Sequence, residues 1–264
     1  MRLLECRCRL AAAGLAFLLA AGLPARAAYV ITTTGQRIDG SDIRAKSDGE
    51  IVLTTPQGTR SFFKGQYVQA VADRPPEIDR VAQMVEAKQY DEAIKMLEDV
   101  ALRYRYLEWD NQALTLLARV CAAKNDRNGA VAAYERLFAG SPKSREDADL
   151  QWAYREALLS AGQSDKLEPL LNKLIESGAR GDAARAQIMR GDVRMAQNQV
   201  EAAALDYLRT VVLFESEQAS QPEALLKTAQ ALEKLRDARA KEMYRTLAAK
   251  YPSSPQAAEA RGKF

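Results

Sequence analysis

The sequence predicts a mainly α protein in which about five helical hairpins form an α-solenoid, preceded by a small antiparallel β-module. Three observations lead to this prediction. A three-residue pattern recurs at a nearly constant spacing, two adjacent prolines mark an abrupt change in composition, and the segment before them is rich in β-branched residues and Asp-Gly pairs. Because a constant spacing is typical of repeat architectures, we expect the region after the prolines to consist of stacked units.

Residues 1–27 predict a secretory signal peptide. Arginines precede an unbroken run of apolar and glycine residues over 10–23, Pro24 follows it, and residues 25–27 read Ala-Arg-Ala. These features are typical of a cleavable signal, so we expect Ala28 to be the first mature residue. The alternative, a membrane anchor, needs about 20 apolar residues. After cleavage we expect no integral membrane segment.

The positions of the cysteines and the absence of histidine limit the cellular locations and the kinds of catalytic or metal site that the sequence allows. No cysteine follows the small-residue cleavage site, so the lipid-anchor pattern is absent and the predicted location is periplasmic or secreted. Cys121 is the remaining cysteine, and we expect it to be a small buried hydrophobe. The chain has no histidine, the usual general base and the commonest zinc and copper ligand. We therefore predict no enzymatic activity, no cofactor and no metal site.

The charge balance argues against nucleic acid as a partner. The whole chain has 38 Lys and Arg against 35 Asp and Glu, but residues 1–27 hold four of the bases and one of the acids. The predicted mature chain is therefore neutral. Binding a phosphate backbone or an anionic lipid surface needs a clustered excess of basic residues, which the composition does not indicate.

Residues 28–73 predict a small antiparallel meander or SH3-like module of four or five strands. Runs of β-branched and aromatic residues alternate there with turn residues, including Asp-Gly pairs at 39–40 and 48–49. Asp-Gly pairs supply the positive φ that tight hairpin turns need. The predicted strand runs are 29–34, 51–55, 59–63 and 67–71.

Residues 74–264 carry the repeat. The prolines at 75 and 76 cannot continue a strand, and the composition after them is dominated by strong helix formers. A small residue is followed four positions later by a bulky one, and three positions after that by a small or apolar one. The copies are Ala93-Leu97-Val100, Ala130-Tyr134-Leu137, Leu167-Leu171-Leu174, Ala203-Tyr207-Thr210 and Ala240-Tyr244-Leu247. Their first residues are 37, 37, 36 and 37 positions apart, which predicts five units.

Turn residues and prolines follow the same spacing. The predicted turns between paired helices are 124–128, 160–164 and 197–199. Pro142 and Pro252 end two of the second helices. With these residues the chain resembles the tetratricopeptide repeat (TPR) family over about 75–260. The third unit departs from the pattern because Leu167 stands at the small position. A generic bundle of five helical hairpins is the alternative fold.

The resemblance implies a binding scaffold. In TPR arrays the first helices line a concave groove, which takes an extended peptide or a partner helix. First-helix residues that face away from the packing stripe are the candidates for this groove. They are Arg119, Trp152, Glu156, Ile188, Asp192, Met195 and Leu225. Because Arg119 and Asp192 are charged, we expect both to be solvated. For Trp152 the alternative expectation is a place in the core.

The resemblance, together with the predicted signal peptide, suggests a protein of the bacterial envelope. We expect a non-enzymatic adaptor of the periplasm or outer envelope whose partners are envelope proteins or peptides, with self-association as a further mode. The alternative is a structural protein that binds peptidoglycan or another glycan through the β-module. Phe62, Phe63 and Tyr67 could stack on sugars there, but we expect them to form the small core of the module.

Overall fold

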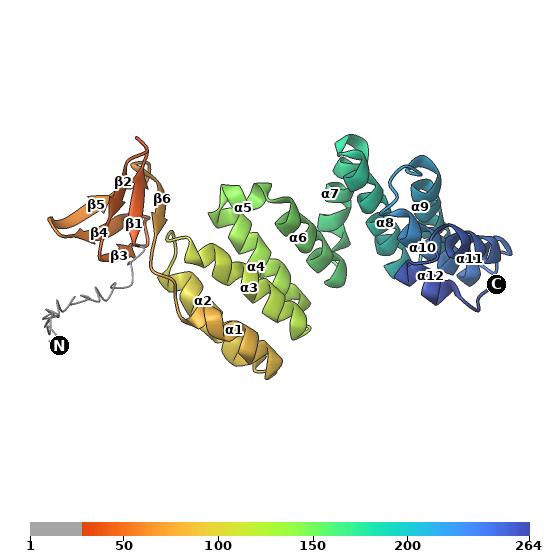
Figure 1. The fold of residues 1–264 in the computed structure, drawn as a ribbon, viewed down its shortest axis with the longest axis horizontal. Helices are drawn as coiled ribbons and strands as arrows, with labels where there is room; N and C mark the ends of the chain where they lie inside the picture. Colours follow the sequence, from red (N-terminus) through yellow and green to blue (C-terminus); the bar gives the residue numbers. More distant parts are fainter. Residues whose placement is uncertain (1–27) are drawn as a thin grey trace, which may run out of the picture. The chain divides into compact units, whose positions relative to one another are not determined.

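The computed structural model describes residues 28–264, so the predicted signal peptide lies outside the described residues. The chain divides into two compact units, with the boundary between Asp73 and Arg74. Over 28–264 the first unit contains six strands and the second contains twelve helices (Figure 1). The predicted fold class, mainly α with a β-module in front, is confirmed. None of the helices in this range combines the length and the apolar character needed to cross a membrane.

The β-unit consists of two three-stranded antiparallel sheets. In one sheet β1 (Tyr29–Thr32) lies between β2 (Arg37–Asp39) and β6 (Tyr67–Val71), and in the other β4 (Ile51–Thr55) lies between β3 (Asp42–Ala45) and β5 (Gly58–Phe62). Residues of β4 alternate, with Ile51 and Leu53 fully buried, as expected for a strand with one core-facing side. The sequence did not predict β2 and β3, because both are short and mostly polar.

Gly40 stands at the crossing from one sheet to the other. Its N–H donates to the carbonyl of Ala28 at 2.9 Å, and the next N–H donates to the carbonyl of Thr54 at 2.7 Å. A Cβ on Gly40 would lie 2.5 Å from Leu53 Cδ1. The prediction that Gly40 supplies a positive φ is wrong, since the residue is needed for space. Gly49, with φ of 91°, follows the predicted rule.

The helical unit consists of five successive hairpins (Figure 1). They are α1 (Glu77–Glu86) with α2 (Tyr90–Arg103), α3 (Trp109–Ala123) with α4 (Arg127–Gly140), α6 (Ala148–Ser160) with α7 (Ser164–Ser177), α8 (Arg180–Ala196) with α9 (Val200–Leu213), and α10 (Gln221–Lys234) with α11 (Arg239–Lys250). Two short helices, α5 (Pro142–Glu146) and α12 (Pro255–Ala260), follow hairpins two and five. The small and bulky residues of every predicted triplet are buried, so the predicted spacing does identify the packing face of the second helices.

Every first helix ends in the same hydrogen-bonded turn. One residue of each turn has a positive φ, and these residues are Lys88, Asn125, Gly162, Asn198 and Arg236. The next N–H donates to the carbonyl five residues back, as from Gln89 to Met84 and from Asp126 to Cys121, both at 2.8 Å. This Schellman motif satisfies carbonyl groups that the helix end leaves free. It reverses the chain within three residues, so the second helix packs back on the first.

A second series of buried residues with the same spacing lies on the first helices. It consists of Val81, Ala118, Arg155, Gly191 and Thr228. In hairpin four the helices approach so closely that a Cβ on Gly191 would lie 2.3 Å from the Tyr207 ring. In hairpin three this position holds the long, charged Arg155, and α6 packs against α7 less extensively than the paired helices of any other hairpin. Hairpin three therefore departs from the pattern in both of its helices, at Arg155 and at Leu167.

Candidate functional site

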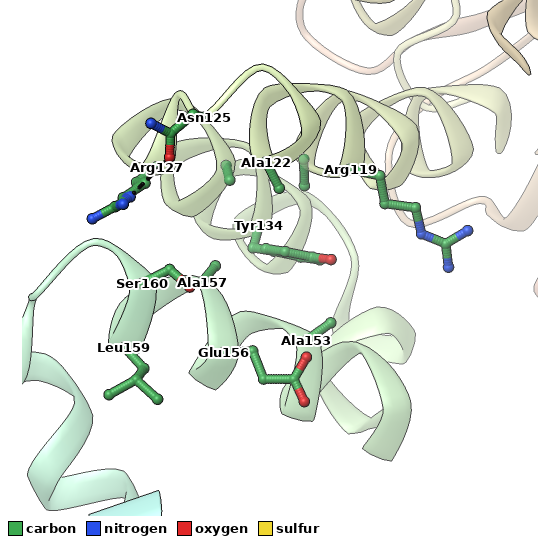
Figure 2. A pocket seen from close by; sticks show the side chains of 12 residues that line it. Arg119, Ala122, Asn125, Arg127, Tyr134, Ala153, Glu156, Ala157, Leu159 and Ser160 are labelled. Atoms are coloured by element: carbon green, nitrogen blue, oxygen red, sulfur yellow. Dashed lines mark hydrogen bonds between the residues drawn. The ribbon is translucent and has the colours of Figure 1, made fainter. Parts of the chain in front are cut away.

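A hollow of about 720 Å³ opens between hairpins two and three (Figure 2). Small side chains on three helices leave this space, because a methyl group projects little from a helix surface. These are Ala118 and Ala122 of α3, Ala130 of α4, and Ala153 and Ala157 of α6. The hollow has the size of a site for a few side chains of a bound segment.

Tyr134 of α4 forms the floor of the hollow. Its ring is almost fully buried and packs against the rings of Phe138 and Tyr154, each at a centroid distance of 6.3 Å. Burial raises the pKa of the Tyr134 hydroxyl, with a smaller opposing effect of Arg119, so the group stays protonated at neutral pH. Figure 2 shows the hydroxyl directed between the side chains of Arg119 and Glu156. It has no hydrogen-bond partner within residues 28–264 and can serve a ligand as donor or acceptor.

The charges around the hollow are not balanced. Arg119 is exposed and forms no ion pair with the described part of the chain, and Arg127 donates only to the neutral Asn125, Nε to Oδ1 at 3.1 Å. The nearby Glu156 pairs with Arg185 of α8 at 2.8 Å, which compensates its charge. The guanidinium groups of Arg119 and Arg127 therefore border the hollow without a carboxylate partner of their own in the described part of the chain. A carboxylate or carbonyl oxygen of a ligand is the group that they would bind.

Arg119 and Glu156 are the two predicted groove residues that the structure brings into one site. The prediction missed Tyr134 as a floor residue, because its spacing identified it only as a packing residue. The cluster of alanines was visible in the sequence, but alanine is common in helices and carries no functional signal on its own.

Trp152 lies in the core between hairpins three and four. Only 7% of the residue is exposed, and its Nε1 donates to Asp182 Oδ1 at 3.2 Å. The guanidinium groups of Arg185 and Arg155 lie 4.0 and 4.9 Å from the ring centroid, within the range of cation–π contacts. Trp152 therefore has the alternative role that the sequence allowed for it, as a core residue, and it does not line a groove.

Ile188 and Leu225 also lie in the core, which corrects their predicted place in the groove. They are 3% and 2% exposed. Each first helix in the second half of the array packs against the preceding second helix as well as its own, α8 against α7 and α9, and α10 against α9 and α11. A first helix therefore buries a wider face than the predicted packing stripe.

Asp192 and Met195 are only partly exposed. Asp192 accepts hydrogen bonds from the Tyr207 hydroxyl at 2.8 Å and from Lys227 Nζ at 2.6 Å, so it joins three helices. Met195 packs against the cluster of hairpin four, and Lys234 Nζ lies 3.5 Å from its sulfur. Neither residue shares the hollow with Arg119. Asp192 is a structural ion-pair partner and not the freely solvated charge that the sequence predicted.

The structure offers little for catalysis or metal binding over 28–264. No group of three or more Cys, Asp or Glu side chains in this range is placed to hold a metal ion. Cys121 is buried, and burial raises the pKa of its thiol from 9.0 to about 11. A thiol with so high a pKa is a poor nucleophile at neutral pH.

The fifth hairpin shows the small and bulky residues Ala240 and Tyr244 buried against α10, with α11 ending just before Pro252. Residues 223–254 match the family model of the tetratricopeptide repeat. The TPR match covers most of α10 and all of α11. Because proteins with this repeat are generally non-catalytic scaffolds, the match supports a role in protein–protein interaction. A search of curated proteins found no match.

Proposed function

We propose that this protein is a non-enzymatic scaffold of the bacterial periplasm or outer envelope that holds a segment of a partner protein in the hollow between hairpins two and three. The observation that carries the proposal is that Arg119 has no ion pair and the adjacent Tyr134 hydroxyl no hydrogen bond within the described residues 28–264, above a lining of alanines. The alanines admit a peptide backbone closely, and the two polar groups supply directional hydrogen bonds to it.

The repeat architecture supports this choice over an enzyme. Stacked hairpins present exposed first-helix side chains at regular intervals, which suits recognition of an extended segment. The TPR match in hairpin five is consistent with this use. The envelope location rests on the predicted signal peptide over residues 1–27.

Charge reversal at Arg119 tests the proposal. Arg119 is exposed, so Arg119→Glu should leave the melting temperature near that of the wild type, while it places a like charge against carboxylate or carbonyl groups of the partner. Lys95→Glu is the matched control, because Lys95 is an exposed base on α2 outside the hollow. We expect Arg119→Glu to lose the proteins that the wild-type chain retains from an envelope extract and Lys95→Glu to keep them. Equal retention by both variants would contradict the proposal.

Glycan binding by the β-unit is the second candidate, and one observation favours it. Phe63 is 57% exposed, which contradicts its predicted place in the core. Phe62 is buried, and Tyr67 is half-buried with its hydroxyl donating to the Gly49 carbonyl at 2.8 Å. Phe63 is thus the ring that is free to stack on a sugar. Co-sedimentation with purified peptidoglycan that is lost in Phe63→Ser would establish this function.

A further inference from the structure

Hairpin four has a residue pattern that is inverted relative to the other hairpins. Asp206 of α9 is fully buried. Asp206 lies three residues after Ala203, the first residue of its triplet. The equivalent positions in the other second helices hold Met96, Ala133, Leu170 and Met243. On the outside of α9, Leu205 and Val212 are 54% and 68% exposed, and of these two Leu205 is peculiar to hairpin four, since Leu102 at the position equivalent to Val212 in hairpin one is also exposed. The positions equivalent to Leu205 hold Lys95, Ala132, Pro169 and Glu242. Hairpin four therefore has a charge inside and apolar side chains outside.

Three arginines converge on the buried carboxylate of Asp206. Arg190 binds it through two nitrogens, Nε to Oδ2 at 3.1 Å and Nη2 to Oδ1 at 2.9 Å. Arg194 Nη1 lies 2.7 Å from Oδ2, and Arg209 Nη1 lies 3.0 Å from Oδ1. Within residues 28–264 no other carboxylate pairs with these three side chains. The cluster therefore carries two positive charges in excess.

Packing alone does not require this cluster. The position equivalent to Arg190 holds Leu117 and Tyr154 in hairpins two and three and a base, Arg80 or Lys227, in hairpins one and five. The position equivalent to Arg194 holds Met84, Cys121, Leu158 and Ala231. The other four hairpins therefore pack without a base at the position of Arg194. A buried ion cluster stabilises a fold little more than well-packed apolar residues would.

The guanidinium groups of Arg194 and Arg209 remain available to a ligand. Their side chains are 27% and 48% exposed. Each gives Asp206 only its Nη1, and Nη2 of both side chains has no hydrogen bond to the described part of the chain. Leu205, Arg209 and Val212 are spaced four and three residues apart, so they lie on one face of α9. Arg209, a cationic donor held by Asp206, thus lies beside exposed apolar side chains, and Arg194 of α8 pairs with the same carboxylate.

We propose that this face of α9 binds an amphipathic helical segment of a partner protein, with acidic side chains of the segment on Arg194 and Arg209 and its apolar side chains on Leu205 and Val212. The surface is separate from the hollow between hairpins two and three, so the proposal goes beyond the function proposed above. A protein segment suits it better than a membrane. Attraction to an anionic membrane adds up over many basic residues, whereas here two excess charges lie at one point of a chain that is neutral after residue 27.

Titration with synthetic helical peptides tests the proposal. The probe is a fluorescent 18-residue amphipathic peptide of leucine and glutamate, and its matched control carries glutamine in place of every glutamate. Anisotropy with the full chain should show at least about tenfold tighter binding of the glutamate peptide, and the difference should shrink as salt is raised. Arg209→Gln should lower the affinity for the glutamate peptide about tenfold. Leu205→Ser with Val212→Ser should weaken binding of both peptides.

The control variant is Arg245→Gln, which changes an exposed arginine on α11 and should bind like the wild type. Melting curves establish that the α9 variants are folded. Equal binding of the two peptides, or normal binding by Arg209→Gln, would overturn the proposal. The proposal would also be overturned if the protein bound neither peptide but sedimented with phosphatidylglycerol vesicles, and Arg209→Gln abolished this sedimentation. The face of α9 would then bind lipid.

Discussion

The close approach of α8 and α9 makes a testable prediction at Gly191. An alanine Cβ there would lie 2.3 Å from Tyr207 Cε1 and 2.7 Å from Cδ1, far inside contact distance. The tyrosine ring would have to move, which also disturbs its hydrogen bond to Asp192. Replacing glycine by alanine in a helix normally stabilises it by up to about 1 kcal/mol. Overpacking costs about 1–3 kcal/mol, and a lost hydrogen bond to a charged group about 1.5–3 kcal/mol. We therefore expect Gly191→Ala to destabilise the protein by about 1.5–5 kcal/mol in net terms.

Thermal and urea unfolding followed by circular dichroism would measure this change. For a domain of this size the loss corresponds to a fall in Tm of roughly 3–20 °C. Gly140→Ala is the matched control, because no heavy atom lies within 4 Å of a Cβ placed there, and it should be neutral or slightly stabilising. A Gly191→Ala variant that is more stable than the wild type would refute the close helix packing on which the repeat assignment depends.

Three further predictions concern the repeat, the thiol and the N-terminus. Ala203→Arg should destabilise the array by about 3 kcal/mol or more in urea unfolding, because it places a charge at a fully buried position, whereas Glu201→Ala should change stability by less than about 0.5 kcal/mol. Cys121 should react with iodoacetamide at pH 8.5 roughly 100-fold more slowly in the folded protein than after denaturation, as followed by peptide mass spectrometry, because its raised pKa leaves little thiolate until the pH approaches about 11. Equal rates would mean that the thiol is exposed. N-terminal sequencing of the exported protein should begin at Ala28, and a product that keeps Met1 would exclude cleavage.

The repeat was predictable because its spacing is a consequence of helix packing. Small residues such as Ala130 and Ala203 recur wherever two helices approach, and chance alanines would not keep intervals of 36 and 37 residues. The short polar strands β2 and β3 were not predictable, since they carry no apolar run. Arg155 shows a further limit. The sequence identified hairpin three as unusual because Leu167 stands at the small position. That Arg155 occupies the closely packed position of the first helix could be recognised only from the structure, in which α6 packs less extensively against α7.

The candidate site was predictable only in part, for a similar reason. The repeat spacing tells which residues face the paired helix, but not how much more of a first helix the preceding hairpin covers. Ile188 and Leu225 were therefore expected in a groove although they are buried, and Asp192 was expected to be solvated although it pairs with Lys227. Arg119 and Glu156 are exposed, as a groove requires, because they lie at the hollow, where α4 and α6 pack less extensively than the adjoining helices of the other neighbouring hairpins.

Site-specific photo-crosslinking in cells tests most directly whether the hollow holds a partner. A photoreactive phenylalanine analogue would replace Ala122, which is exposed at the hollow, and in a separate variant Lys95 on α2. If the hollow between hairpins two and three is the binding site, irradiation should give a defined covalent adduct from position 122 and none from position 95, and the additional change Arg119→Glu should abolish the adduct. An adduct at position 95 with none at position 122, or an adduct at 122 that survives Arg119→Glu, would contradict the account.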